Sequence, residues 1–156
     1  MAEIPERVYS RFITKEVNAA GIYLVTLFVN GYEFPVILDD YFPVVGNRPA
    51  FCSSKEGEIW AMLLEKAWAK LYGSYMRTEG GQTAHATQHL MGYPAHTYDH
   101  SNIQPAQFWK ELVEFDKRNY VMLTSSNSGT NEETEDGVVQ GHAYSLISIF
   151  EIQAHG

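Results

Sequence analysis

The sequence predicts an α+β fold built as two small lobes. A β-hairpin pattern comes first, two stretches with apolar residues at helical spacing follow, and two short β-branched stretches near the end are typical of strands. The 156 residues are 45% hydrophobic and 19% charged, which is enough apolar material for a core and argues against intrinsic disorder. A chain of this length forms one domain of ordinary size or two small lobes that share a cleft.

Charge and cysteine content exclude several classes of function. Eleven Lys and Arg against 19 Asp and Glu give a net charge of −8, which disfavours sequence-independent nucleic-acid binding and anionic membranes. A single cysteine rules out an internal disulfide framework and a cysteine-based zinc site. Residues 1–7 do not resemble a secretory signal, and the most apolar stretch, 21–29, is too short to span a bilayer. We therefore expect a cytoplasmic protein.

The first element is a β-hairpin. Residues 21–29 and 32–38 are rich in β-branched and aromatic side chains, and Asn30-Gly31 stands between them. An Asn-Gly pair suits the type I′ turn, which requires positive φ at both central positions. Pro35 cannot donate a ladder hydrogen bond, so the second strand is expected at a sheet edge or with a bulge.

A long helix is expected over 55–72. Ser53 followed by Glu56 has the pattern of a capping box, and Gly73 suits the left-handed position that ends a helix. The apolar residues at helical spacing, which we expect to form one buried stripe, are Trp60, Leu64, Ala67, Trp68 and Leu71.

The second half begins at paired glycines, Gly80-Gly81, which lie between polar residues as in a hinge. We place the lobe boundary there, with lobes 1–80 and 81–156. A second long helix opens at Pro105, a residue suited to the first helical position. The other expected elements are a short helix over 83–91, an extended stretch over 93–98, a strand over 120–124, a solvated acidic loop over 125–137 and a strand over 143–152.

Four histidines form two pairs with the i, i+4 spacing of a helix: His85 with His89, and His96 with His100. Such spacing directs two imidazoles toward one metal ion. However, no glutamate follows His85 as in the zinc-protease pattern H-E-x-x-H, and Pro94 interrupts any helix that would carry the second pair. Surface or capping histidines are therefore the favoured interpretation, and a His-rich metal-binding domain is kept as an alternative.

Two residues are candidates for nucleophilic chemistry. Cys52 precedes the first long helix, and a helix N-terminus lowers a thiol pKa, so a pair with His142 is one interpretation. A small buried hydrophobe is the commoner fate of a free cysteine. His142 follows Gly141, and a glycine lets a substrate backbone approach a general base closely. A structural histidine at the start of a strand is the alternative.

An acidic run is the last candidate. It contains Glu132, Glu133, Glu135 and Asp136. Its spacing does not match the EF-hand calcium loop, so we expect a solvated loop.

Three blocks together resemble the catalytic domain of calpain cysteine proteases. Residues 58–75, with Glu-Ile-Trp at their start and Leu-Leu-Glu-Lys-Ala in the middle, resemble the calpain helix E-F-W-x-x-L-L-E-K-A-Y-A-K-x-x-G-S-Y. Glu79-Gly80-Gly81 resembles the S-G-G hinge, and Val139-Gln-Gly-His-Ala-Tyr-Ser145 resembles K-G-H-A-Y-S around the catalytic histidine. The hairpin is also similar, and the resemblance extends from Arg7 to Ile152.

This resemblance implies a partial papain-like core of two lobes, the first with a helix and hairpin and the second with a helix and antiparallel strands. His142 would be the general base that activates a cysteine, and Gly81 and Gly141 would bind the substrate backbone. Glu58 matches one carboxylate of the family's first-lobe calcium site. The partner of such an enzyme is a protein or peptide substrate, and its metal ion is calcium.

The resemblance also shows departures. The family's nucleophile motif G-D-C-W and the orienting asparagine of N-P-W-G do not occur in these 156 residues, and Cys52 does not align with the nucleophile. We therefore expect a piece of a calcium-dependent endopeptidase that is inactive alone and does not bind calcium tightly, with Glu58 in an incomplete site. The alternative is a non-catalytic binding or scaffold module. Either would expose an apolar core face that a partner chain covers.

Overall fold

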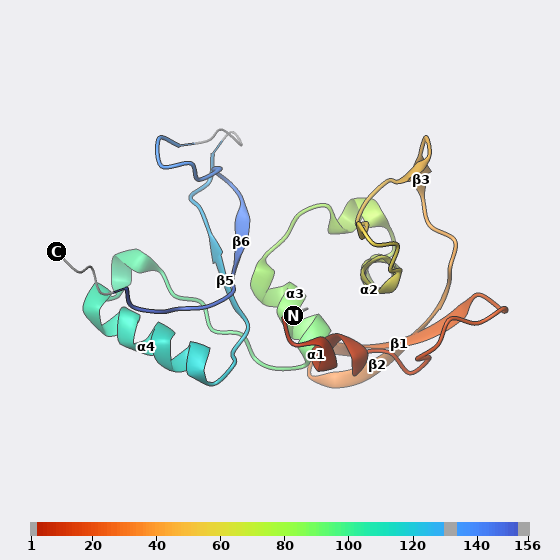
Figure 1. The fold of residues 1–156 in the computed structure, drawn as a ribbon, viewed down its shortest axis with the longest axis horizontal. Coiled ribbons are helices and arrows are strands. Elements are labelled where there is room, and N and C mark those ends of the chain that lie inside the picture. The colour runs from red at the N-terminus through yellow and green to blue at the C-terminus, as the bar shows by residue number, and fades with distance from the viewer. Residues whose placement is uncertain (1–2, 130–133, 153–156) are drawn as a thin grey trace. The chain divides into compact units, whose positions relative to one another are not determined.

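The computed structural model describes residues 3–129 and 134–152. The chain divides into two compact units, Met1–His96 and Thr97–Gly156. Helices and two-stranded antiparallel sheets make up the described parts, which confirms the α+β prediction (Figure 1). The boundary between the units falls after His96, whereas the lobe boundary expected at Gly80-Gly81 refers to the protease lobes and stays a prediction.

A β-hairpin is the base of the first unit. The short helix α1 (Pro5–Tyr9) precedes β1 (Ile22–Val29), which pairs with β2 (Tyr32–Asp39) in an antiparallel register from Ile22↔Asp39 to Val29↔Tyr32. The turn residues Asn30 and Gly31 have φ of 51° and 82°, so the expected type I′ geometry is confirmed. Pro35 lies in β2, which has β1 as its one partner strand among the described residues.

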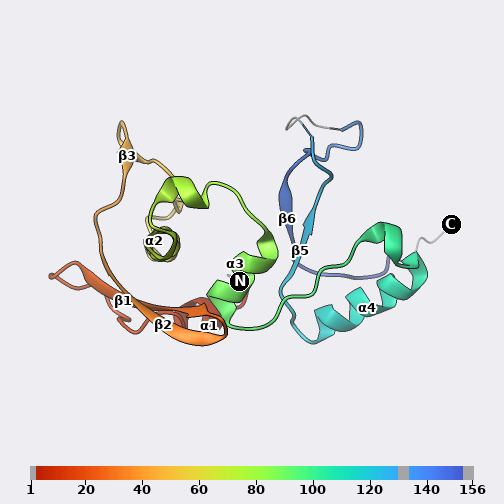
Figure 2. The same cartoon turned by 180° about the vertical axis from the view of Figure 1, so that it is seen from behind.

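Helix α2 (Trp60–Tyr72) packs on this hairpin and forms the core with it, as Figure 2 shows from behind. Leu27, Leu63 and Val25 are the largest fully buried side chains. The helix begins five residues later than expected. The predicted capping box at Ser53 and Glu56 is wrong, because the residue before the helix is Ile59 and no side chain caps it. Gly57 has a φ of +83°, and this turn precedes the first helical residue. The predicted end at Gly73 is confirmed by its left-handed φ of 93°.

The rest of the first unit surrounds this core. Helix α3 (Thr83–Met91) forms where a short helix was expected, and it packs against β1. Gly92 ends it with a φ of +77°, and a Cβ at this position would lie 2.6 Å from the Phe28 ring. The sequence analysis missed four short elements of this unit: helix α1, the two-residue strands β3 (Val44–Val45) and β4 (Arg48–Pro49), and the 3₁₀ helix η1 (Tyr75–Thr78).

The second unit contains the 3₁₀ helix η2 (His100–Asn102), α4 (Pro105–Lys117), β5 (Met122–Ser125) and β6 (Ala143–Leu146). Helix α4 starts at Pro105 as predicted. The strand expected over 143–152 ends at Leu146, because Leu146 pairs with Met122, the first residue of β5, and no strand faces the residues that follow among those described. No helix in the described parts of the chain is long and apolar enough to cross a bilayer.

Candidate active-site histidine

His142 lies immediately before β6, on the hairpin that β5 and β6 form in the second unit. Gly141 has a φ of +65°, and this left-handed turn brings its N–H to the carbonyl of Asn127 at 2.8 Å. A side chain at position 141 would be strained in that conformation, so the glycine has a local structural reason. The hairpin therefore fixes the main chain on which the imidazole is carried.

The imidazole of His142 is exposed, so a reacting group in solution can reach it. Its ring contacts the half-buried ring of Tyr144 edge to face, with centroids 5.0 Å apart and planes at 74°. Both side chains lie on the same side of the strand because they are two residues apart. An exposed imidazole on a fixed main chain is suited to transferring protons.

Gly81, the other expected substrate-binding residue, lies in the first unit between η1 and α3. It is exposed, and a Cβ built on it would have no heavy atom within 4 Å. Its main-chain groups are therefore open to a ligand. Gly81 and Gly141 belong to different units, and their roles in substrate binding stay predictions.

Glu58 lies just before α2, where its carboxylate accepts a hydrogen bond from the Ser54 hydroxyl. It also lines a pocket of about 510 Å³ whose walls come from α1, β1 and α2. The described residues contain no group of three or more His, Cys, Asp or Glu side chains that could hold a metal ion. Glu58 therefore belongs to no such group among the described residues, and a calcium role for it stays a prediction.

One histidine of each pair, His89 and His100, makes aromatic contacts. His89 on α3 accepts or donates a hydrogen bond with the Tyr72 hydroxyl at 3.2 Å and meets the Trp68 ring edge to face at 5.5 Å. Burial, with the charge of His85 as a smaller cause, lowers the pKa of His89. His100 lies in the second unit against Phe108. These contacts favour a packing role over metal binding.

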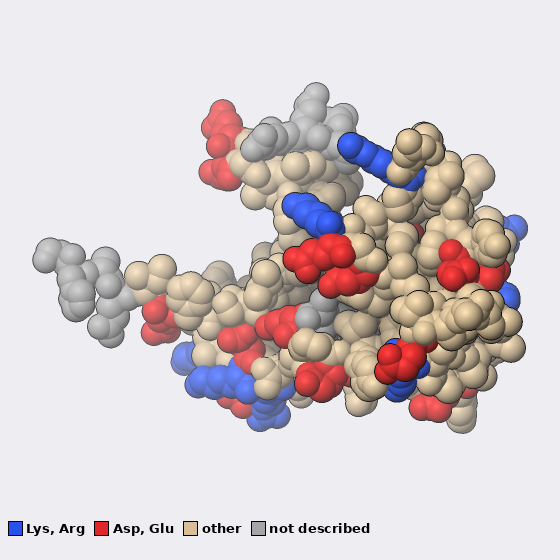
Figure 3. Space-filling model, turned by 45° about the vertical axis from the view of Figure 1, so that its right-hand side comes forward, with Lys and Arg blue, Asp and Glu red and all other residues tan. Residues whose placement is uncertain are grey.

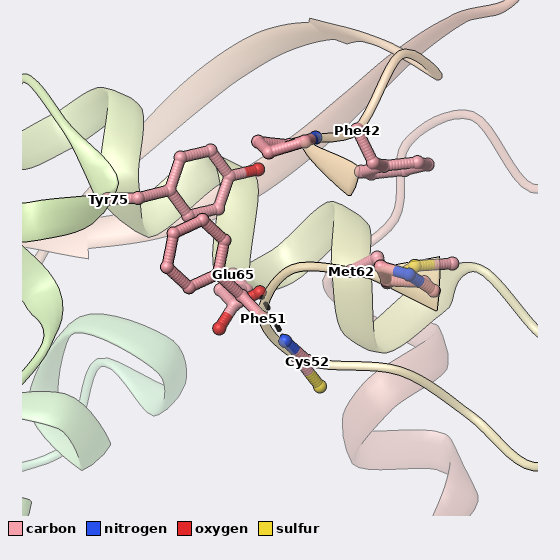
Figure 4. Close-up of a pocket in the computed structure, with 8 residues that line it drawn as sticks. Phe42, Phe51, Cys52, Met62, Glu65 and Tyr75 are labelled. Atoms are coloured by element: carbon pink, nitrogen blue, oxygen red, sulfur yellow. Dashed lines mark hydrogen bonds between the residues drawn. The ribbon is translucent and has the colours of Figure 1, made fainter. Parts of the chain in front are cut away.

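Cys52 lies in a loop whose main chain is held by α2 (Figure 4). Its N–H donates to the Glu65 carboxylate at 3.0 Å, and Figure 4 shows the thiol pointing away from that carboxylate. Cys52 is exposed, so the expected buried hydrophobe is wrong. Partial desolvation and the negative charge of Glu65 raise the pKa of its thiol. A raised pKa disfavours the thiolate, so this environment is opposite to that of an activated nucleophile.

Each residue from Leu63 to Ala67, at the centre of α2, is either buried in the core or hydrogen-bonded to a neighbouring segment. Leu63, Leu64 and Ala67 are buried in the core, and Glu65 accepts the Cys52 N–H. Lys66 extends over the end of β2, where its Nζ donates to the carbonyl of Asp39 at 3.0 Å, to its carboxylate at 2.6 Å and to the carbonyl of Tyr41 at 2.6 Å. This block therefore fixes α2 on the hairpin.

Among the residues that the structure describes, the acidic side chains form no group that could hold a metal ion. Acidic side chains are spread over the face seen in Figure 3, which agrees with the net charge of −8. In the acidic run, Glu135 and Asp136 lie in a turn closed by a hydrogen bond from the Gly137 N–H to the Thr134 carbonyl at 2.9 Å. Glu132 and Glu133 lie outside the described residues.

Comparison with known proteins identifies the family. A family model described as "Calpain family cysteine protease" matches residues 2–156. The chain is 34% identical to the calpain-type cysteine protease DEK1 of Arabidopsis thaliana, over 96% of this chain and 7% of the relative. It is 34% identical to Calpain-A of Drosophila melanogaster, over 86% of this chain and 16% of the relative. It is 32% identical to human Calpain-9, over 88% of this chain and 20% of the relative. The chain thus spans a fifth or less of these relatives, and it belongs to the calpain family of cysteine proteases.

Proposed function

We propose that this chain is the part of a cysteine endopeptidase domain that supplies the general base, His142. The observation that carries the proposal is the exposed imidazole on a main chain fixed by the left-handed Gly141. In this role His142 takes the proton from a cysteine thiol as the thiolate attacks the substrate carbonyl. It then gives the proton to the leaving amine, so the acyl-enzyme can form.

The nucleophile in this proposal is a cysteine other than Cys52. The raised thiol pKa and the nearby Glu65 carboxylate support this assignment, since both oppose thiolate formation. The 156 residues contain no second cysteine. We therefore expect the isolated chain to cleave no peptide bonds, because an imidazole without a thiolate forms no acyl-enzyme.

The finer parts of the proposal come from the family. Gly81 and Gly141 bind the main chain of a protein substrate, and the open space around Gly81 supports this role. Calcium, with Glu58 as one ligand, would regulate the intact enzyme by aligning its active site. Limited proteolysis in the cytoplasm would be the cellular activity.

A chimeric enzyme tests the role of His142. The matching segment of human Calpain-9 is replaced by this chain, and the calcium-dependent cleavage of casein is measured. We expect His142→Ala to lower kcat by more than about 100-fold, in line with the loss of a general acid–base group. His100→Ala, which removes a packing histidine of the same unit, is the matched control. Equal activity of the two variants would refute the assignment.

The isolated chain provides a second test. Purified protein is incubated with denatured casein and calcium, and peptides are detected by mass spectrometry. We expect no cleavage. Cleavage that Cys52→Ser abolishes would contradict the proposal and identify Cys52 as the nucleophile.

The apolar pocket beside Glu58 favours a binding module as a second candidate function. Its walls include Phe12, Trp60 and Leu63, and at its rim Tyr9 and Val17 are 58% and 81% exposed. A partner chain would cover such a face. Light scattering would show concentration-dependent association of the isolated chain, which Val17→Lys would reduce. A monodisperse monomer at all concentrations would contradict this second candidate.

A further inference from the structure

The side-chain hydroxyl of Ser126 makes hydrogen bonds that are additional to the main-chain pairing of β5 with β6. Ser126 follows β5 directly, opposite His142, and its own N–H donates to the His142 carbonyl at 2.9 Å. This bond extends the ladder of β5 and β6 by one residue beyond Ser125↔Ala143. The N–H of His142, however, donates to the Ser126 side-chain oxygen at 3.0 Å. The side chain thus takes the place of a main-chain acceptor.

The same hydroxyl also holds the segment that leads to His142. Ser126 Oγ donates to the Val139 carbonyl at 2.7 Å. The hydroxyl has one proton to donate, and the Val139 carbonyl is nearer to it than the His142 carbonyl, which lies 3.3 Å away; its lone pairs remain free to accept the His142 N–H. Ser126 therefore connects both ends of the turn over 139–142 to β5.

Tyr144 supports the turn from the other strand. Its hydroxyl accepts the Val139 N–H at 2.9 Å, while its ring contacts the imidazole of His142 edge to face. The main chain of His142 is thus fixed by Ser126, and its ring lies against Tyr144. Half-burial of both Ser126 and Tyr144 protects these contacts from competition by water.

We propose that Ser126 is a positioning residue that presets the imidazole of His142 for proton transfer. The proposal rests on the proposed function of His142 as general base. A misplaced catalytic group lowers the rate of the chemical step more than the binding of substrate. The contribution of Ser126 is therefore expected in kcat.

The first test uses the 156-residue chain itself. Amide hydrogen exchange and the side-chain order of His142 are measured by NMR in the wild type, Ser126→Ala and Ser126→Thr. We expect Ser126→Ala to speed exchange at the His142 amide by about tenfold, as for the loss of one hydrogen bond, and to disorder its ring. Ser126→Thr keeps the oxygen and should restore both.

Ser125→Ala is the matched control, since the Ser125 hydroxyl makes no hydrogen bond within the described residues. It should leave the exchange of the His142 amide unchanged. Equal exchange rates in Ser126→Ala and Ser125→Ala would overturn the proposal.

The second test uses the chimeric protease. We expect Ser126→Ala to lower kcat by about tenfold with little change in KM, and Ser126→Thr to recover most of the loss. An unchanged kcat in Ser126→Ala, beside an inactive His142→Ala, would overturn the positioning role and leave the general base in place. An unchanged kcat in His142→Ala would instead refute the proposed function, and the positioning role with it.

Discussion

Lys66 provides a quantitative test of how α2 is attached to the hairpin. Its side chain is 18% exposed, and Nζ donates to the carbonyls of Asp39 and Tyr41 as well as to the Asp39 carboxylate. Lys66→Met keeps most of the aliphatic stem but removes all three bonds. The carboxylate of Asp39 is 57% exposed, so we assign it no share of the free energy.

The two carbonyl bonds determine the expected size of the effect. Hydrogen bonds that involve a charged group contribute about 1.5–3 kcal/mol each, and partial access of water reduces this, so we expect a loss of about 2 kcal/mol. For a unit of this size that loss lowers the melting temperature by about 10 °C.

Thermal unfolding followed by far-UV circular dichroism measures the effect. Lys55→Met is the matched control, since Lys55 is exposed and has no hydrogen bond or ion pair within the described residues. We expect the control to melt within about 1 °C of the wild type. Equal shifts for the two variants would show that the contacts of Lys66 do not stabilise the unit.

Three further predictions follow from burial and from the pKa shifts. Leu27→Ala should lower the free energy of unfolding in urea by about 3 kcal/mol, because Leu27 is fully buried. Ile37 lies on the same hairpin and is 61% exposed, so Ile37→Ala should lower it by less than about 1 kcal/mol. Equal losses would contradict the assigned core face. The lowered pKa of His89 means that the unfolded chain binds the proton more tightly than the folded chain. The contribution of neutral His89 to folding stability is therefore complete above pH 6.5 and decreases as the pH falls below it. His89→Gln should reduce this pH dependence of the free energy of unfolding, and an unchanged slope would refute the assignment to His89. Cys52 should react slowly with iodoacetamide at pH 7, and it should react faster in Glu65→Gln, because the carboxylate helps to raise the thiol pKa. An equal or slower rate in that variant would contradict the effect of the Glu65 charge.

Local signals predicted the elements that have strong local causes. Asn30-Gly31 predicted the hairpin turn, Pro105 the start of α4 and Gly73 the end of α2, and each requires a backbone geometry that few residues provide. The start of α2 was misplaced because Ser53 and Glu56 have the letters of a capping box. In the structure the hydroxyl of Ser54 instead accepts the Glu56 N–H at 3.1 Å.

Elements that depend on a partner strand or on tertiary contacts were harder to predict. The apolar residues after Leu146 have the pattern of a strand, but β5 is too short to pair with them. The strands β3 and β4 have two residues each, which is below the length at which alternation can be recognised. The role of Ser126 was missed for a similar reason, because a single serine in a polar loop belongs to no recognisable sequence pattern. The bond between Ser126 and His142, which lie 16 residues apart in the sequence, depends on the pairing of β5 with β6.

The environments of His142 and Cys52 differ in a way that bears on the proposed activity. A general base must be exposed and oriented. The side chain of His142 is exposed, its main chain is held by Gly141 and Ser126, and its ring lies against Tyr144. A nucleophilic thiol needs a neighbouring positive charge or a histidine, whereas Cys52 has the carboxylate of Glu65 beside it. Lysine at position 65 would favour the thiolate, and the glutamate found there opposes it. The Glu65 carboxylate of α2 thus disfavours the Cys52 thiolate, which supports the proposal that the nucleophile is a cysteine other than Cys52.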